Sequence, residues 1–142
     1  MDEAPHTPGY ASCFGCGGTM PGGLHVHVVD DDPQELVATA RLNTAHQGPP
    51  GLAHSGVVAA LMDEVISLVL WRLLDRRCLT ARLEAAFLVP VPIDRDLEVR
   101  ARCTGVHGRK VYTSAQVLIA GTVYAEAAGL FIDVTDSAAS VR

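Results

Sequence analysis

The stretch from His46 to Glu64 reads HQGPPGLAHSGVVAALMDE, and it decides the fold of the chain. It begins with a rigid Gly/Pro loop at 48–51 and leads into a long apolar segment that continues to Leu74. Four residues between Val57 and Leu74 are not apolar, namely Asp63, Glu64, Ser67 and Arg72. A surface helix would show a polar face, so this segment predicts a helix enclosed by protein on most sides. A carboxylate there is costly unless it has a partner, which makes the acidic pair a functional candidate.

The composition is that of an ordinary globular domain. The chain has 142 residues, enough for a single domain over 1–142 with a sizeable core. Hydrophobic residues make up 49% and charged residues 19%, which argues against a disordered chain. The formal net charge of -5 argues against a nucleic-acid partner, although a local basic patch can still hold an anionic ligand.

The N-terminal residues lack the basic region and apolar core of a signal peptide. The apolar run approaches membrane-spanning length, but Asp63, Glu64 and Arg72 interrupt it, so we expect a buried helix and no membrane partner. We therefore predict a cytoplasmic protein. Its four cysteines are then expected to be reduced thiols: Cys13, Cys16, Cys78 and Cys103.

Residues 1–23 are predicted to form an N-terminal arm with a CxxC turn at 13–16, and residues 135–142 a short tail. As a zinc site the CxxC is half a ligand set, because no second CxxC or CxxH follows. His25 and His27 would complete it, but they alternate with apolar residues as one face of a strand does. A tight turn with two small buried thiols is therefore favoured, and no metal is expected.

Alternating apolar residues predict strands on both sides of the central helix. Before it they cover 24–29 and 36–42, with an acidic turn at 30–33, and after it they cover 80–89, 97–103, 111–119 and 123–134. This order lacks βαβα alternation, so it predicts an α+β fold: a mostly antiparallel curved sheet of about six strands around one long central helix. One helix does not cover such a sheet, so we expect an oligomer formed through strand edges or sheet faces.

Several motifs occur together along this chain. They are HQGPPG at 46–51, HSG at 54–56, LMDE at 61–64, TARLE at 80–84, PVP at 90–92, and CFGCG at 13–17 followed by PGGL at 21–24. In this order they resemble the hotdog-fold acyl-CoA thioesterases, in particular the branch containing PaaI and the human thioesterase superfamily members 4 and 5. The resemblance runs from about Cys13 to Val134. It implies hydrolysis of an acyl-CoA without metal or organic cofactor, by a homodimer or homotetramer with active sites at the subunit interface.

Thioester hydrolysis needs N–H donors for a developing oxyanion and a base. The first N–H groups of a helix are free, and its dipole favours an anion. We therefore expect the amides of Ser55 and Gly56 to hold the oxyanion, each contributing on the order of 3 kcal/mol. The alternative is that Ser55 caps the helix while Gly56 allows close packing.

Asp63 lies seven residues after Gly56 and on the same helix face. The resemblance implies that it is the general base or nucleophile; otherwise it is a core acid that ties down a loop or a subunit contact. Glu64 points about 100° away around the helix, and we interpret it as structural or as a partner that supports Asp63. Thr80 resembles the family position whose hydroxyl orients the attacking water, usually from the neighbouring subunit, although a strand threonine is ordinarily just a strand former.

His46 and His54 flank the Gly/Pro loop, and each either binds the thioester carbonyl or holds the loop, with His54 the better candidate. Gly48 is assigned to substrate binding together with His46. A triad of Ser55, His54 and Asp63 is disfavoured because adjacent residues rarely face each other. Ser55 stands where the family usually has glycine, and its side chain would narrow the acyl pocket or disturb the oxyanion amide.

The phosphates of coenzyme A need cations near the mouth of the site. The candidates are Arg109 and Lys110 in the hairpin whose turn is marked by residues 107–109, and Arg76 and Arg77 after the helix. Each is otherwise an ordinary surface charge. The sequence has no Walker-type or dinucleotide-binding glycine motif, so nucleotide-driven chemistry has no support.

Three other functions compete with this interpretation. A non-catalytic acyl-CoA or acyl-carrier binding protein would keep the pocket and lack a base; Asp63 argues against it and Ser55 leaves it open. A hotdog hydratase or dehydratase typically places an Asp/His pair in a different loop context, and this sequence does not show that arrangement. A CxxC zinc or redox module would reveal itself in metal analysis and thiol titration. With 5% aromatic residues, the chain favours neither a flat aryl pocket nor a long acyl tunnel.

Overall fold

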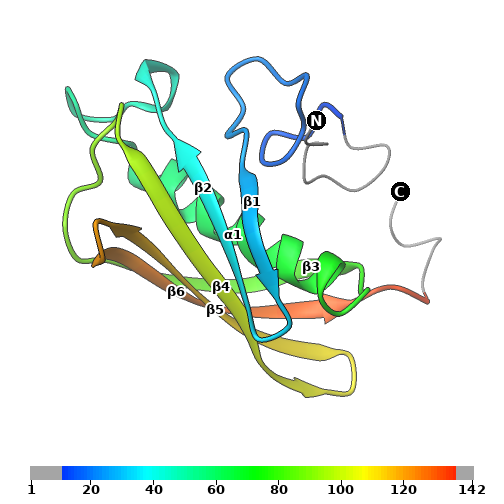
Figure 1. Ribbon diagram of the computed structural model, residues 1–142. Helices are drawn as coiled ribbons and strands as arrows, with labels where there is room; N and C mark the ends of the chain where they lie inside the picture. Colours follow the sequence, from blue (N-terminus) through cyan, green and yellow to red (C-terminus); the bar gives the residue numbers. More distant parts are fainter. Residues whose placement is uncertain (1–10, 137–142) are drawn as a thin grey trace.

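The computed structural model describes residues 11–136, which fold as one curved sheet with a long helix lying in its concave side (Figure 1). The elements are β1 (His27–Asp32), β2 (Glu35–Arg41), the short 3-10 helix η1 (Thr44–His46), α1 (Ser55–Arg72), β3 (Cys78–Phe87), β4 (Asp96–His107), β5 (Lys110–Ile119) and β6 (Thr122–Asp133). The strand order is β1-β2-β4-β5-β6-β3, and every neighbouring pair is antiparallel. This confirms the predicted α+β architecture.

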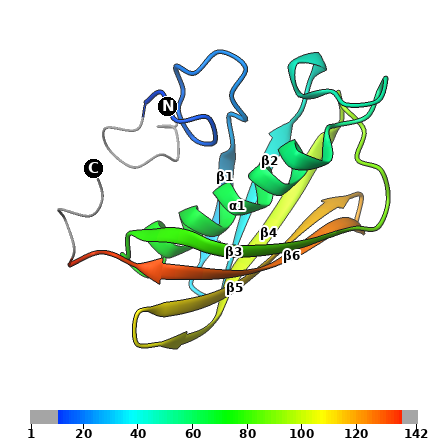
Figure 2. The ribbon, with the colours of Figure 1, turned by 180° about the vertical axis from the view of Figure 1, so that it is seen from behind.

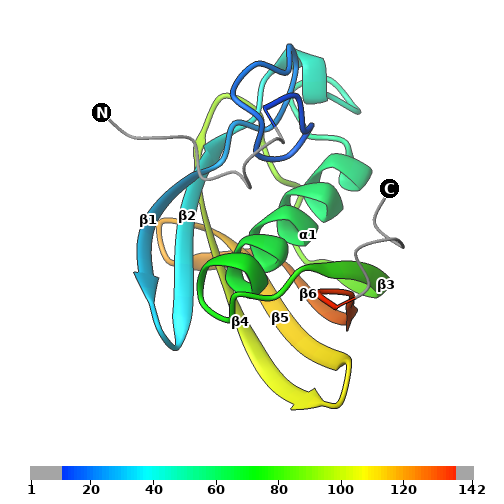
Figure 3. The same cartoon turned by 90° about the vertical axis from the view of Figure 1, so that its right-hand side faces the viewer.

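Helix α1 is the centre of the core. No residue between Val57 and Trp71 is exposed, so the helix is enclosed as its sequence predicts. Figure 3 shows the sheet curving around it, with β1 and β2 on one side and β3 and β6 on the other. Leu61, Val65 and Ile66 are completely buried, and the inward-facing residues of all the longer strands pack around them.

Each of the six predicted strands is present, and their boundaries shift by up to four residues from the predicted ones. The first strand runs from His27 to Asp32, so the acidic triplet expected to form a turn lies in the strand, and the turn falls at Pro33 and Gln34. A bulge between Val28 and Asp30 accompanies this shift. The helix begins at Ser55, where the free amides were expected. It ends at Arg72, two residues before the apolar run does, because Asp75 takes a left-handed conformation with φ 52° that stops it.

Strand β3 is an edge strand that leaves apolar side chains uncovered. It pairs with β6 on one side and lies at the end of the sheet on the other (Figure 2). Leu79, Phe87 and the following Leu88 are 49%, 48% and 56% exposed. An edge with free backbone groups and exposed apolar side chains is a surface on which another strand can pair.

Within residues 11–136, no helix combines the length and hydropathy that crossing a bilayer requires.

Candidate functional site

The start of α1 is capped by His54 rather than by Ser55. His54 is the N-cap residue, and its Nδ1 accepts a hydrogen bond of 2.9 Å from the Gly56 amide. The alternative that Ser55 caps the helix is therefore wrong: Ser55 is the first helical residue, and its side chain is exposed. Within the described residues the Ser55 amide donates no hydrogen bond, so it is free to receive an anion, whereas the Gly56 amide is already used.

His46 is buried at 2% exposure, and both of its ring nitrogens are engaged. Nδ1 accepts from the Asn43 amide at 3.0 Å, and Nε2 lies 2.8 Å from the carbonyl oxygen of Gly22, to which it donates. His46 thus joins the N-terminal arm to the loop before the helix, as expected of a residue that holds the loop. Gly48 lies against His54, because a Cβ at Gly48 would come within 3.1 Å of the His54 Cα.

Asp63 and Thr80 meet on the side of α1 that faces β3. The Thr80 hydroxyl donates to the Asp63 carboxylate at 2.7 Å, within one chain, whereas the resemblance implied a hydroxyl from the neighbouring subunit. A bulge places Thr80 there: Thr80 pairs with Phe131 and Arg82 with Leu130, which leaves Ala81 as the extra residue. Bulges redirect side chains near functional sites. The result is a half-buried carboxylate beside an exposed hydroxyl.

Glu64 faces the N-terminal arm instead. The thiol of Cys13 lies 4.0 Å from Glu64 Oε1, and the ligand atoms of Cys13, Cys16 and Glu64 all lie within 4.8 Å of one another. Burial raises the pKa of Glu64; the hydrogen bond from Cys16 lowers it in part, and the charge of Asp63 raises it further. Burial, and next the charge of Glu64, raise the pKa of Cys16. The sequence places Glu64 away from Asp63 but gives no signal that the CxxC turn lies on it.

A cavity of about 170 Å³ adjoins this side of the helix. It lies between the CxxC turn, α1 and the beginning of β3, and its walls include Glu64, Leu68, Trp71 and Leu79. A larger hollow of about 470 Å³ lies on the sheet, and none of the predicted site residues lines it.

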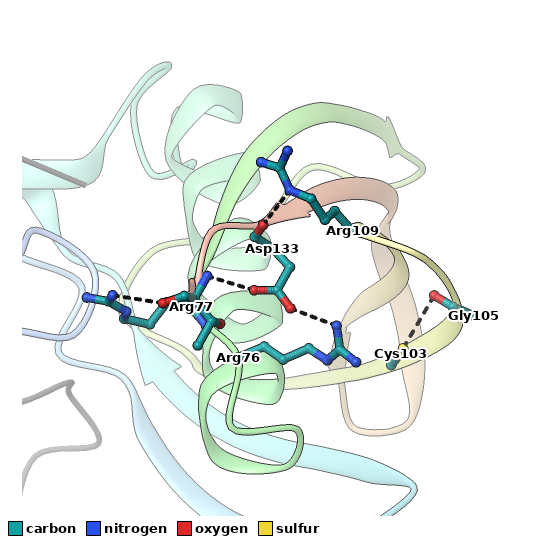
Figure 4. Close-up of polar contacts among 7 residues, drawn as sticks. Arg76, Arg77, Cys103, Gly105, Arg109 and Asp133 are labelled. Carbon is teal, nitrogen blue, oxygen red and sulfur yellow. Dashed lines mark hydrogen bonds and ion pairs between the residues drawn. The ribbon is translucent and has the colours of Figure 1, made fainter. Parts of the chain in front are cut away.

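The predicted phosphate-binding cations gather at the end of the molecule where α1 and β6 end. Figure 4 shows Arg76, Arg77 and Arg109 around Asp133. Arg76 pairs with the Asp133 carboxylate at 2.7 Å, Arg109 donates to the Asp133 carbonyl at 3.1 Å, and Arg77 donates to the Thr135 carbonyl at 3.4 Å.

Hydrogen bonds from Thr135, and next the Arg76 guanidinium, lower the pKa of Asp133. Within the described residues each arginine side chain uses one of its five N–H donors, so the others can still bind an anion. Lys110 is exposed at the adjacent hairpin.

Comparison with known proteins identifies the family. The family model described as "Thioesterase superfamily" matches residues 50–126, more than half of the chain. The matched segment contains α1, Asp63 and Thr80. The chain therefore belongs to the thioesterase superfamily.

Curated relatives are named acyl-coenzyme A thioesterases. The chain is 34% identical over 88 residues to THEM4 of Bos taurus, an alignment that covers 61% of this chain and 35% of that protein. It is 33% identical over the same length to human THEM5, again covering 61% and 35%. The chain thus matches about a third of the length of these curated relatives.

Solved structures show the same fold. A thioesterase superfamily protein shares 33% identity at a TM-score of 0.64, covering 70% of this chain and 49% of that one. A hypothetical thioesterase from Streptococcus pneumoniae, solved with coenzyme A, superposes at a TM-score of 0.72 with 16% identity, covering 78% and 89%. These neighbours confirm the hotdog fold.

Proposed function

We propose that this chain hydrolyses an acyl-CoA thioester to a free acid and coenzyme A, and that it does so in the cytoplasm. The observation that carries the proposal is the contact between Asp63 and Thr80, on the central helix of a thioesterase superfamily chain. A carboxylate held by a hydroxyl on a half-buried surface is suited to accept a proton from a water molecule. The names of the curated relatives support the same reaction.

In the proposed mechanism Asp63 acts as the general base and Thr80 orients it and the attacking water. The water oxygen bonds to the thioester carbon while its proton passes to Asp63. The carbonyl oxygen becomes an oxyanion, which the Ser55 amide stabilises at the positive end of α1. The intermediate then collapses, the C–S bond breaks, and the leaving thiolate takes up the proton that Asp63 accepted, which regenerates the carboxylate. The Gly56 amide joins the oxyanion site only when the exposed His54 ring turns away from it.

The proposed oxyanion donor, the Ser55 amide, and the proposed base, Asp63, must come from two different copies of the chain to form one site. Ser55 and Asp63 are eight residues apart on one helix, about 12 Å along its axis, whereas reacting atoms must approach to about 3–3.5 Å. A single thioester therefore does not reach both groups of one chain. We propose a dimer formed along the exposed edge of β3, in which Ser55 of one copy faces Asp63 of the other. A homotetramer would pair two such dimers.

Mixed dimers test this arrangement. Ser55→Pro removes the amide proton at a position where proline is tolerated, because Ser55 is the first helical residue and His54 has φ -63° and ψ 133°. Asp63→Asn removes the base. If the site is shared, co-refolding the two inactive variants restores activity, since one site of the mixed dimer is intact. Sites contained in one chain would leave the mixture inactive.

The coenzyme A phosphates are proposed to bind at Arg76, Arg77 and Arg109, with Lys110 beside them. Arg77 lies three residues before Thr80, about 10 Å along the extended chain, a distance that the pantetheine arm can span. His46 and Gly48 are proposed to act by shaping the loop that presents the Ser55 amide, since His46 has both nitrogens engaged.

The first test is thiol release from a panel of acyl-CoAs with short aliphatic, long aliphatic and aryl acyl groups. We expect wild-type protein to hydrolyse at least one class, and Asp63→Asn to bind that substrate with little turnover. The most active class names the acyl specificity. Binding of acyl-CoA without turnover by wild-type protein would instead establish the non-catalytic binder, and failure to bind or hydrolyse any member would refute both.

A further inference from the structure

We propose that Cys13, Cys16 and Glu64 form a binding site for one thiophilic divalent cation, of which zinc is the best match. The sequence shows only the CxxC, half of a ligand set, and favours no metal. The fold adds the carboxylate of Glu64, so that three ligand atoms lie within 4.8 Å of one another. Ligands on one zinc ion are about 3.6–3.8 Å apart, given the usual bond lengths and tetrahedral angles, so closure by about 1 Å suffices.

The backbone of the CxxC turn is built directly against the carboxylate. Gly15 is buried, and a Cβ added there would lie 2.0 Å from Glu64 Oε1, so only glycine allows this approach. The Gly17 amide donates to the Cys13 carbonyl at 2.9 Å, and the Leu24 amide donates to the Phe14 carbonyl at 2.8 Å. These bonds hold both thiols on the side of α1.

Within the described part of the chain, Glu64 forms no ion pair. Arg76 and Arg77 line the adjacent cavity, and the side-chain bonds they form within the described residues go to Asp133 and Thr135 and not to Glu64. A charged carboxylate in the half-buried position of Glu64 is costly, and a bound divalent cation would offset this cost.

The ligand chemistry selects the metal. Two thiolates and one carboxylate suit zinc and disfavour magnesium and calcium, which prefer oxygen ligands alone. Three protein ligands leave one coordination position for water or another small ligand, as in open zinc sites. The cavity of about 170 Å³ beside Cys13, Cys16 and Glu64 provides room for it.

Cobalt titration of the full reduced chain tests the site. We expect one Co²⁺ per chain, with thiolate-to-cobalt absorption in the near ultraviolet that Zn²⁺ abolishes by displacement. The double variant Cys13→Ser/Cys16→Ser should lose this absorption, and Glu64→Gln should weaken binding at least about tenfold. The matched control Cys78→Ser/Cys103→Ser removes the other two thiols and should keep both stoichiometry and affinity.

A second measurement uses wild-type protein alone, so it does not depend on the folding of a variant. Saturating Zn²⁺ should slow the alkylation of Cys13 and Cys16 at least about tenfold, a factor taken from the affinity effects seen at metal sites. The alkylation rates of Cys78 and Cys103 should stay unchanged. The proposal fails if the reduced protein binds no Co²⁺, if binding survives the loss of both arm cysteines, or if Glu64→Gln binds as wild type does. A Cys13–Cys16 disulfide whose reduction yields no metal uptake would also refute it.

Discussion

Asp63 and Glu64 are neighbours in the sequence, yet the two sides of α1 give them different surroundings. Asp63 faces the edge strand β3 and accepts a hydrogen bond from Thr80. Glu64 faces the N-terminal arm, where its carboxylate lies within 4.8 Å of the thiols of Cys13 and Cys16. The difference comes from the rotation of about 100° between consecutive helical residues. Two neighbouring carboxylates on a buried helix thus contact different parts of the fold.

The largest expected difference between Asp63 and Glu64 appears when each carboxylate is changed to its amide. Asp63→Asn should lower kcat/KM for thioester hydrolysis about a thousandfold, because it removes the proposed base. Glu64→Gln should lower it less than about tenfold, since Glu64 does not face Thr80, and a general acid–base contribution starts at about a hundredfold. Thiol release by purified variants measures both values. Equal losses would show that the acidic pair acts as one unit.

Removal of the proposed oxyanion donor, the Ser55 amide, should cause the next largest loss of activity. Ser55→Pro should lower kcat about 100- to 1000-fold, because it removes the free amide proton at the start of α1. Ser55→Ala keeps the amide and serves as the matched control, with kcat close to wild type. Thermal melting of both variants shows whether the helix start survives. If the proline variant folds and hydrolyses normally, the Ser55 amide is not the donor.

Substitution of Thr80 tests whether its hydroxyl supports the proposed base Asp63. Thr80→Val keeps the shape and removes the hydroxyl, which should reduce kcat about 10- to 100-fold, since a hydrogen bond to a charged group contributes about 1.5–3 kcal/mol. Thr80→Ser restores the donor and should recover most of the activity. Steady-state kinetics on the three proteins measure the effect. An equally impaired serine variant would point to lost packing rather than a lost donor.

Gly15→Ala tests the packing of the CxxC turn against Glu64 and should have the smallest effect on hydrolysis. Its new methyl group would displace the Glu64 carboxylate, so we expect a loss of about 1–2 kcal/mol of stability with hydrolysis nearly retained. Gly105→Ala is the control, because a Cβ there meets no atom within 4 Å. Denaturant unfolding measures the stability, and a loss of activity in step with it would mean that the two sides are coupled.

The sequence predicted the fold well because the strongest signals are local. A long apolar run with almost no polar face, interrupted by Asp63, Glu64 and Arg72, predicts an enclosed helix, and alternating residues on both sides of it predict strands. The displaced first strand shows the limit: Asp30, Asp31 and Asp32 have turn-forming side chains, but pairing with β2 extends the strand through them. Pairing partners lie outside a local pattern, so element boundaries followed from the tertiary structure.

The single buried helix, the acidic pair on it and the motifs that resemble the thioesterases can all be found in the sequence alone. Which groups come into contact follows only from the folded structure. It placed Thr80 on Asp63 through a bulge in β3, gave the helix cap to His54, and laid the CxxC turn on Glu64. The contact of Asp63 with Thr80 joins residues 17 positions apart, and that of Glu64 with Cys13 joins residues 51 positions apart. Such distant contacts arise only when the sheet closes around the helix.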